Sequence, residues 1–313
     1  KMEELYEEVV PITAGPAQEE PVEEPFKVLV PVAAPQNAPE YVRLADRIAR
    51  ARAGEAVIQV LNITEIPDQT PSEVARERAR SNVNAIERSL ADADLQMAYT
   101  LEGHTCREVA FDILNTARDH EADLIVMGHP EERPDVTESV EYDAPCDVIF
   151  VTGRGATDRL HTINLGVGGG PHHLAALPLV NDLVTSGSDL NLIHVRAPDA
   201  VPEDPGRTIA RLADRVTAAV HTLSADSVAS GLIDAAEENG GVLIVGASRT
   251  RRLRQWIFGS TPDRVVDLAA DRDMPVLVYT SAVGITGRIE GWVFPIYRYV
   301  RKRFGRGTRR REE

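Results

Sequence analysis

The sequence is poor in lysine, cysteine and aromatic residues, and it has no long apolar run. Only three of its 313 residues are lysine, two are cysteine, and aromatic residues make up 5%. The two cysteines, Cys106 and Cys146, are too few for a disulfide framework and lack the spacing of metal ligands, which favours a reducing, cytoplasmic environment. Because no run of 18 apolar residues occurs, the sequence predicts no membrane-spanning helix.

Charge is plentiful but mostly of one sign. The chain has 49 acidic and 34 basic residues, a formal net charge of −15. An acidic, lysine-poor composition is typical of proteins from halophiles, because at about 1 M salt the Debye length falls to about 3 Å and carboxylates hardly repel each other. An ordinary acidic protein is the alternative. In either case a negative surface argues against nucleic acid as a partner.

The two ends of the chain differ in charge from the rest. Residues 1–25 contain Pro and Glu in alternation and predict an extended acidic linker. Residues 283–313 form a basic tail in which aromatic residues lie among arginines, and residues 288–311 suit an anionic membrane surface. Docking onto the acidic body and RNA binding are the alternatives for this tail. Since the sequence begins with Lys1 rather than Met, we expect it to be part of a longer protein.

Between the ends, apolar segments typical of buried parallel strands alternate with helical patterns. The first series predicts strands at 27–32 (KVLVPV), 56–63, 95–101, 123–128 (DLIVMG) and 147–152 (DVIFVT), with helices at about 38–53, 71–91 and 106–119. A second series repeats the pattern about 135 residues later, with strands at 162–167, 189–195, 242–246 (VLIVG) and 275–280 (PVLVYT). The sequence therefore predicts a duplicated α/β domain, at 26–153 and 160–282.

These strands resemble those of the universal stress protein family, which have a first strand like VLVPV, a late strand like DLIVMG and a last strand like PVLVY. The resemblance implies two tandem, doubly wound, parallel five-stranded sheets of the adenine-nucleotide α-hydrolase-like type. It also implies self-association through the last strand of each sheet. We therefore expect 147–152 and 275–280 to pair within the chain as an intramolecular pseudo-dimer.

The loop after 242–246 carries most of a phosphate-binding motif. Some members of the family bind ATP through G-x2-G-x9-G-(S/T), and the matching residues here are Gly246, Arg249, Gly259, Ser260 and Thr261. Glycines let the backbone approach a phosphate, and a hydroxyl at a helix N-terminus adds donors and positive potential. The resemblance therefore implies a site for ATP or a related adenine nucleotide.

Three residues at strand ends complete the candidate nucleotide site. Val167, Gly168 and Val195 follow or end the first two strands of the second repeat, where doubly wound folds place their ligands. Gly168 stands where the family has an aspartate that contacts adenine, and Ala33 stands there in the first repeat. Both copies thus lack this carboxylate, which counts against ATP.

Arg249, at the position of the middle glycine, leaves two interpretations open. Its side chain disfavours a positive φ and its bulk could block the phosphate path, or its guanidinium could pair with phosphate. The first repeat departs further from the motif. Its loop is ten residues shorter, is acidic and has no Gly-Ser/Thr, so we expect no phosphate there. The second repeat is instead shortened around 205–235.

Other chemistry finds little support in the sequence. The adjacent histidines His172 and His173 would point apart, so no metal is expected. No arrangement of Ser-His-Asp, Cys-His or paired carboxylates indicates catalysis. Cys106 at a helix start could have a lowered pKa, but a small buried residue is the commoner case. We therefore expect no catalytic residues and no enzyme.

The features together predict a non-enzymatic regulatory or sensor module. The chain resembles the cytosolic C-terminal region of haloarchaeal amino-acid permeases and cation–chloride cotransporters, in which tandem universal stress domains follow a membrane transporter. The resemblance implies a transporter, in the same polypeptide or as a partner, and a place at the cytosolic face of the plasma membrane. The alternative is a free-standing, soluble, ATP-binding universal stress protein.

Overall fold

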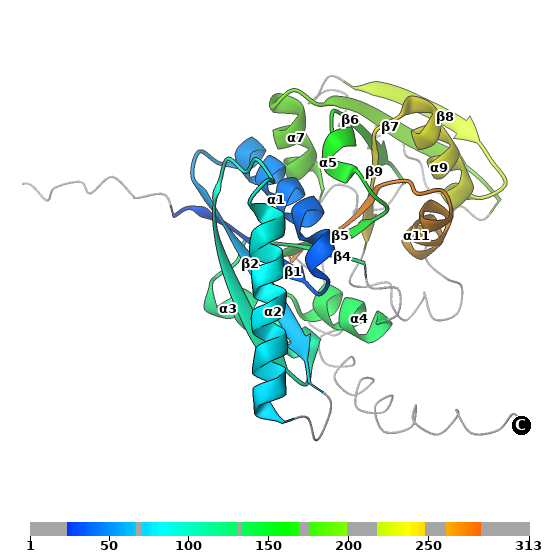
Figure 1. Ribbon diagram of the computed structural model, residues 1–313. Coiled ribbons are helices and arrows are strands. Elements are labelled where there is room, and N and C mark those ends of the chain that lie inside the picture. The colour runs from blue at the N-terminus through cyan, green and yellow to red at the C-terminus, as the bar shows by residue number, and fades with distance from the viewer. Residues whose placement is uncertain are drawn as a thin grey trace, which may run out of the picture.

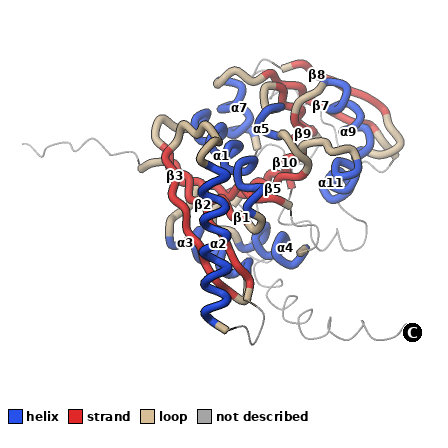
Figure 2. Tube along the Cα trace, in the orientation of Figure 1, coloured by secondary structure: helices blue, strands red, loops and turns tan. Residues whose placement is uncertain are grey.

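A computed structural model describes residues 24–66, 71–129, 133–168, 176–198, 218–247 and 261–282. Ten strands form one sheet in the order β3-β2-β1-β4-β5-β10-β9-β6-β7-β8, with helices on both sides (Figures 1 and 2). All pairings are parallel except β5 with β10 at the centre. Two five-stranded parallel sheets are therefore joined edge to edge, as the sequence predicted.

The N-terminal half supplies the first five strands and four helices. Its strands are β1 (Phe26–Val32), β2 (Ala56–Glu65), β3 (Ala98–Cys106), β4 (Leu124–Gly128) and β5 (Asp147–Thr152). A 3-10 turn, η1 (Pro35–Asn37), leads into α1 (Ala38–Arg52), and the other helices are α2 (Ser72–Leu90), α3 (Val109–Asp119) and α4 (Pro134–Asp143). Helices α1 and α2 lie in contact in front of the sheet (Figure 1).

The C-terminal half repeats the same strand order. After the short helix α5 (Ala156–Arg159) come β6 (Thr162–Gly166), α7 (Leu177–Thr185), β7 (Asp189–Arg196), β8 (Ala219–Ser224), α9 (Val228–Asn239), β9 (Val242–Ala247), α11 (Thr261–Asp271) and β10 (Val276–Thr280). Strand β8 has six residues against nine in β3, while residues 205–217 of the segment predicted to be shortened lie outside the described residues. Helix α9, at 12 residues, is not shorter than α3 at 11.

The antiparallel pairing of β5 with β10 creates a pseudo-twofold axis. Thr152 pairs with Val276, Thr280 pairs with Val148, and Phe150 meets Val278 at the centre. Equivalent residues of the two strands thus make reciprocal contacts, as in an isologous dimer. Both strands have a neighbour on each side, so neither offers a free edge to another molecule.

One carboxylate fixes the register of this junction. Asp147 accepts hydrogen bonds from the hydroxyl of Tyr279, from Ser281 Oγ at 3.2 Å and from the Ala282 backbone N–H at 2.8 Å. Burial, followed by the hydrogen bond and charge of Asp147, raises the pKa of Tyr279, so the phenol stays protonated and remains a donor.

The hydrophobic core continues across the junction on both faces of the sheet. One cluster includes Val42 of α1 and Val180 of α7, and the other includes Ile113 of α3 and Ile233 of α9. Helix α1 contacts α5 and α7 of the other half. The halves therefore share two apolar layers.

The third strand lies further along the chain than the pattern at 95–101 predicts. The backbone N–H groups of Gln96 and Met97 both donate to Asp46 Oδ1 at 2.8 Å, and Asp46 is a buried residue of α1. These two groups therefore bond to a side chain rather than to β2, and the ladder begins at Ala98. Helix α3 accordingly begins at Val109 rather than near 106.

Within the described ranges, no helix is long and apolar enough to cross a membrane. The linker before residue 24 and the basic tail after residue 282 lie outside the described residues, so the predictions made for them remain predictions.

Candidate functional site

Ligands of doubly wound sheets bind beyond the carboxyl ends of the strands, where the strand order reverses. This sheet has two such switch points, one between β1 and β4 and one between β6 and β9. The eight residues predicted from the sequence belong to the second.

Five of these eight residues are described, and four of them lie at the carboxyl ends of β6, β7 and β9. Val167 and Gly168 follow β6, and Val195 lies near the end of β7. Gly246 is the next-to-last residue of β9 and pairs with Tyr279 of β10, and Thr261 begins α11. Arg249, Gly259 and Ser260 lie outside the described residues.

Exposure separates the residues that could meet a ligand through their side chains from those that could not. Val167 and Val195 are each 4% exposed and belong to core clusters on opposite faces of the sheet, so only their backbone could contact a ligand. Gly168 is exposed, and no described atom lies within 4 Å of a Cβ added there. Gly246 and Thr261 are half-buried. Among the described residues, none therefore fills the space beside Gly168.

A histidine without a predicted role fixes the end of β6. His194 Nδ1 lies 3.0 Å from the carbonyl oxygen of Val167, and the Val167 N–H donates to the carbonyl of Ile193 at 2.8 Å. In the N-terminal half the equivalent position is Asn62, whose side-chain amide donates to the Val32 carbonyl at 2.8 Å. Each half thus uses a side chain of its second strand to hold the end of its first.

The β1–β4 switch point contains a cavity of about 310 Å³. Its walls come from the end of β1, the start of α1, the ends of β2 and β4, and the first turns of α3 and α4. The sequence does not predict this cavity. For this half it predicts only that no phosphate binds. We call it the β1–β4 cavity.

Tyr41 of α1 reaches over the end of β4. A Cβ added to Gly128 would overlap the Tyr41 hydroxyl, so the glycine allows the tyrosine to lie against the strand. Burial, and to a lesser extent the charge of Glu40, raises the pKa of Tyr41. The phenol therefore stays neutral at physiological pH and can donate a hydrogen bond.

At the mouth of the cavity, the arginine that a phosphate would need is already engaged in ion pairs. Arg133 Nη1 lies 2.5 Å from Glu65 Oε2, and Arg133 Nε lies 3.4 Å from Asp135 Oδ1. Hydrogen bonds from Glu65 and Asp135 raise the pKa of Arg133. Two carboxylates thus face one guanidinium, and helix α4 occupies the segment after β4. Asp135 belongs to the segment predicted to be acidic, whereas Glu65 comes from the end of β2.

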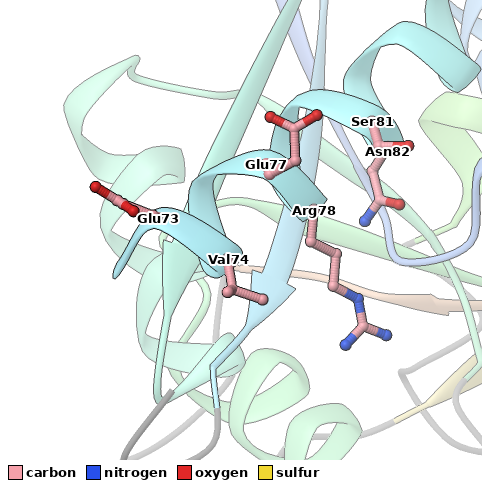
Figure 3. A pocket seen from close by; sticks show the side chains of 6 residues that line it. All are labelled: Glu73, Val74, Glu77, Arg78, Ser81 and Asn82. Atoms are coloured by element: carbon pink, nitrogen blue, oxygen red, sulfur yellow. The ribbon is translucent and has the colours of Figure 1, made fainter. Parts of the chain in front are cut away.

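A larger hollow, of about 660 Å³, lies on the outer face of α2 and is lined only by residues of that helix (Figure 3). They are Glu73, Val74, Glu77, Arg78, Ser81 and Asn82. All but Asn82 are exposed. Because one helix supplies every side chain, this hollow is a shallow surface feature, and the switch points are better candidates.

Thiol and metal chemistry have no clear site in the described part of the chain. Burial, followed by the charge of Asp112, raises the pKa of Cys106 to about 11, so the lowered pKa considered for this residue is wrong. Cys146 is buried. The described ranges contain no group of three potential metal ligands, and His172 and His173 lie outside them.

Solved structures match this arrangement. Neither a protein-family profile nor a curated protein matches the sequence. A crystal structure of a universal stress protein from Archaeoglobus fulgidus DSM 4304 matches 82% of this chain and 96% of its own, at 18% identity and a TM-score of 0.57. The chain has the fold of the universal stress proteins.

Two further structures support that fold. A putative universal stress protein from Pseudomonas aeruginosa UCBPP-PA14 matches with a TM-score of 0.51 at 16% identity, over 82% of this chain and 93% of its own. A functionally unknown protein from Pseudomonas aeruginosa PAO1 matches with a TM-score of 0.52 at 17% identity, over 82% and 92%. At such identities the likeness concerns the fold alone.

Proposed function

We propose that this chain is a non-enzymatic regulatory module of the universal stress protein type, whose C-terminal half senses an adenine nucleotide at the β6–β9 switch point. The observation that supports this most is that no described atom lies within 4 Å of a Cβ added at Gly168, at a switch point where β9 ends in Gly246-Ala247. The loop that leaves β9 has the family's spacing up to Gly259, Ser260 and Thr261. A helix N-terminus and glycine backbone suit a phosphate.

Isothermal titration with ATP–Mg²⁺ tests the nucleotide. The variant Gly168→Leu should weaken binding at least tenfold, because its side chain would fill the space at the switch point. Gly54→Leu is the matched control, since a Cβ added at Gly54 also meets nothing within 4 Å and Gly54 lies in the other half. If the wild-type chain gives no binding heat with ATP, ADP or AMP, the nucleotide part of the proposal fails.

We further propose that the module acts on a membrane transporter at the cytosolic face of the plasma membrane. Support comes from the sequence: the Pro/Glu segment before residue 26 and the basic, aromatic tail at 288–311. Sedimentation with anionic phosphatidylglycerol vesicles at low salt should carry down the full chain but not a chain ending at residue 287. If both chains sediment equally, the tail does not bind the vesicles and its part of the proposal is wrong.

The alternative is a free-standing, soluble, ATP-binding stress protein. It is supported by the near-complete coverage of three solved structures by this chain. The gene upstream of Lys1 discriminates between the two, because a segment encoding several membrane spans would favour the transporter.

A further inference from the structure

The proposed nucleotide site leaves the β1–β4 cavity without a role. Its volume of about 310 Å³ is at the small end of the range for ligand pockets. Protein interiors are close-packed, and voids larger than a water molecule are few. This cavity, however, opens to solvent at a mouth, and it lies at a switch point, where doubly wound folds bind their ligands.

The walls of the cavity are mainly apolar. Ile63 of β2 and Met127 of β4 form one side, and Val109 and Ile113 of α3 and Val136 of α4 form another. Ile113, Met127 and Val136 are at most 5% exposed and belong to the core cluster on this face of the sheet. A ligand in contact with these side chains gains most from an apolar body.

The rest of the described lining offers hydrogen bonds, and its guanidinium is already paired. The Tyr41 hydroxyl and the Asn37 amide lie on the α1 side of the cavity. Arg133, the cation of the lining, is already paired with Glu65 and Asp135. A phosphate or carboxylate would have to break these ion pairs and face both acidic groups, so the lining disfavours anions.

The cavity is also held in shape by fixed contacts around it. Asn62 is fully buried and holds the end of β1 through Val32. Glu40, next to Tyr41, accepts a hydrogen bond from the backbone N–H of Ala156 at 3.0 Å, which ties the start of α1 to α5. Such preorganisation lowers the cost of binding, because little needs to be ordered.

We propose that the β1–β4 cavity binds an uncharged, mainly apolar small molecule whose polar group meets Tyr41 and Asn37. The two halves then recognise different chemistry: a neutral, apolar compound in the N-terminal half and an anionic nucleotide in the C-terminal half. The site does not depend on the nucleotide, and each can be tested without the other.

Methionine-methyl NMR on the wild-type chain tests the cavity with N-phenyl-1-naphthylamine, a neutral apolar fluorophore. Met127 lines the cavity, whereas Met274 lies in the other half and Met97 lies outside the lining. Saturable shifts of the Met127 methyl, with Met274 and Met97 unchanged, are expected together with a rise in dye fluorescence at one site per chain. Shifts spread over all three methyls, or no saturation, would overturn the proposal.

A matched pair of variants locates the dye independently. Val109→Phe places a larger side chain into the cavity and should weaken dye binding at least tenfold. Val228→Phe makes the same change at the equivalent, similarly half-buried position of α9 and should leave binding unchanged.

Excess ATP should not displace the dye from the wild-type chain. Equal loss in both variants, or displacement by ATP, would contradict a separate apolar site. Circular dichroism shows whether each variant is folded. Should Val109→Phe fail to fold, the Met127 methyl of the wild-type chain still decides the question.

Discussion

The two halves of the sheet share a strand order but differ after the fourth strand. In the N-terminal half, β4 is followed within a few residues by α4, and Arg133, just before this helix, pairs with Glu65 at the mouth of a cavity. In the C-terminal half, β9 ends in Gly246-Ala247 and the next described helix begins only at Thr261. The two halves therefore differ in the described elements that follow the fourth strand, while the strand order of the sheet is the same in both.

A second difference concerns how each half holds the end of its first strand. Asn62 is fully buried, whereas its equivalent, His194, is half-buried. The N-terminal switch point is thus fixed by an amide shielded from water, and the C-terminal one by a ring that water can reach. Burial makes the hydrogen bond of Asn62 the more costly of the two to lose.

The largest expected effect lies where the halves meet. Phe150 and Val278 face each other on the pseudo-twofold axis and are 2% and 7% exposed. Phe150→Ala should lower the free energy of unfolding by about 3–5 kcal/mol because it leaves a large cavity, and Val278→Ala should cost less, about 1.5–3 kcal/mol. Urea unfolding followed by circular dichroism measures both. Equal costs would show that the two strands contribute alike to the junction.

Thiol reactivity reports on the N-terminal half alone, since both cysteines lie there. The pKa of Cys106 rises from 9.0 to about 11, which lowers its thiolate fraction at neutral pH by about 100-fold. Alkylation by iodoacetamide should accordingly be slow at pH 7 and should accelerate as the pH approaches 11. Asp112→Asn removes a charge that raises this pKa and should speed the reaction. Rapid labelling of Cys106 at pH 7, measured by mass spectrometry, would contradict the assignment.

Replacing Asn62 and His194 tests the difference in how the two halves hold the end of their first strand. Asn62→Ala removes a buried donor and should destabilise the chain by about 1–3 kcal/mol. His194→Ala should cost less, since water can replace its hydrogen bond. The urea midpoints of the two variants show which substitution destabilises the chain more. A larger loss of stability for His194→Ala would contradict the comparison.

The smallest effect is expected at the surface of the C-terminal half. Arg272 bridges α11 to α9 through Asp234 at 2.6 Å and Glu237 at 3.0 Å, but both carboxylates are well exposed. Exposed ion pairs contribute little and are screened by salt. Arg272→Gln should leave the thermal midpoint unchanged in 1 M KCl. A clear drop there would show that this pair matters more than its exposure suggests.

Much of the fold could be predicted because buried parallel strands appear in the sequence as continuous apolar runs. The segments that became β1, β4, β5 and β9 were identified nearly to the residue, and the central pairing of β5 with β10 is confirmed. The edge strand β3 was misplaced because its start is decided by Asp46, a residue of a different element. Local alternation of apolar residues does not contain such long-range contacts.

The candidate site was less predictable than the fold. Glycines and hydroxyl residues at motif spacing pointed to the β6–β9 switch point, but they did not show that the side chains of Val167 and Val195 are buried in the core. The β1–β4 cavity was missed because its lining brings together elements that are far apart in the sequence, such as the end of β1 at Val32 and the start of α4 at Val136. The sequence shows Tyr41 only as a large side chain near the start of α1, and its position over Gly128 depends on the fold.

The antiparallel pairing of β5 with β10 has a consequence for how the two sites can change. In a dimer of identical chains, every substitution appears in both copies, and dilution separates them. Here the covalent connection keeps the partner strand at a high local concentration however dilute the protein is. A substitution such as one at Arg133 then alters one site and leaves the other as it was. One chain can therefore carry two switch points with different side chains in a fixed one-to-one ratio.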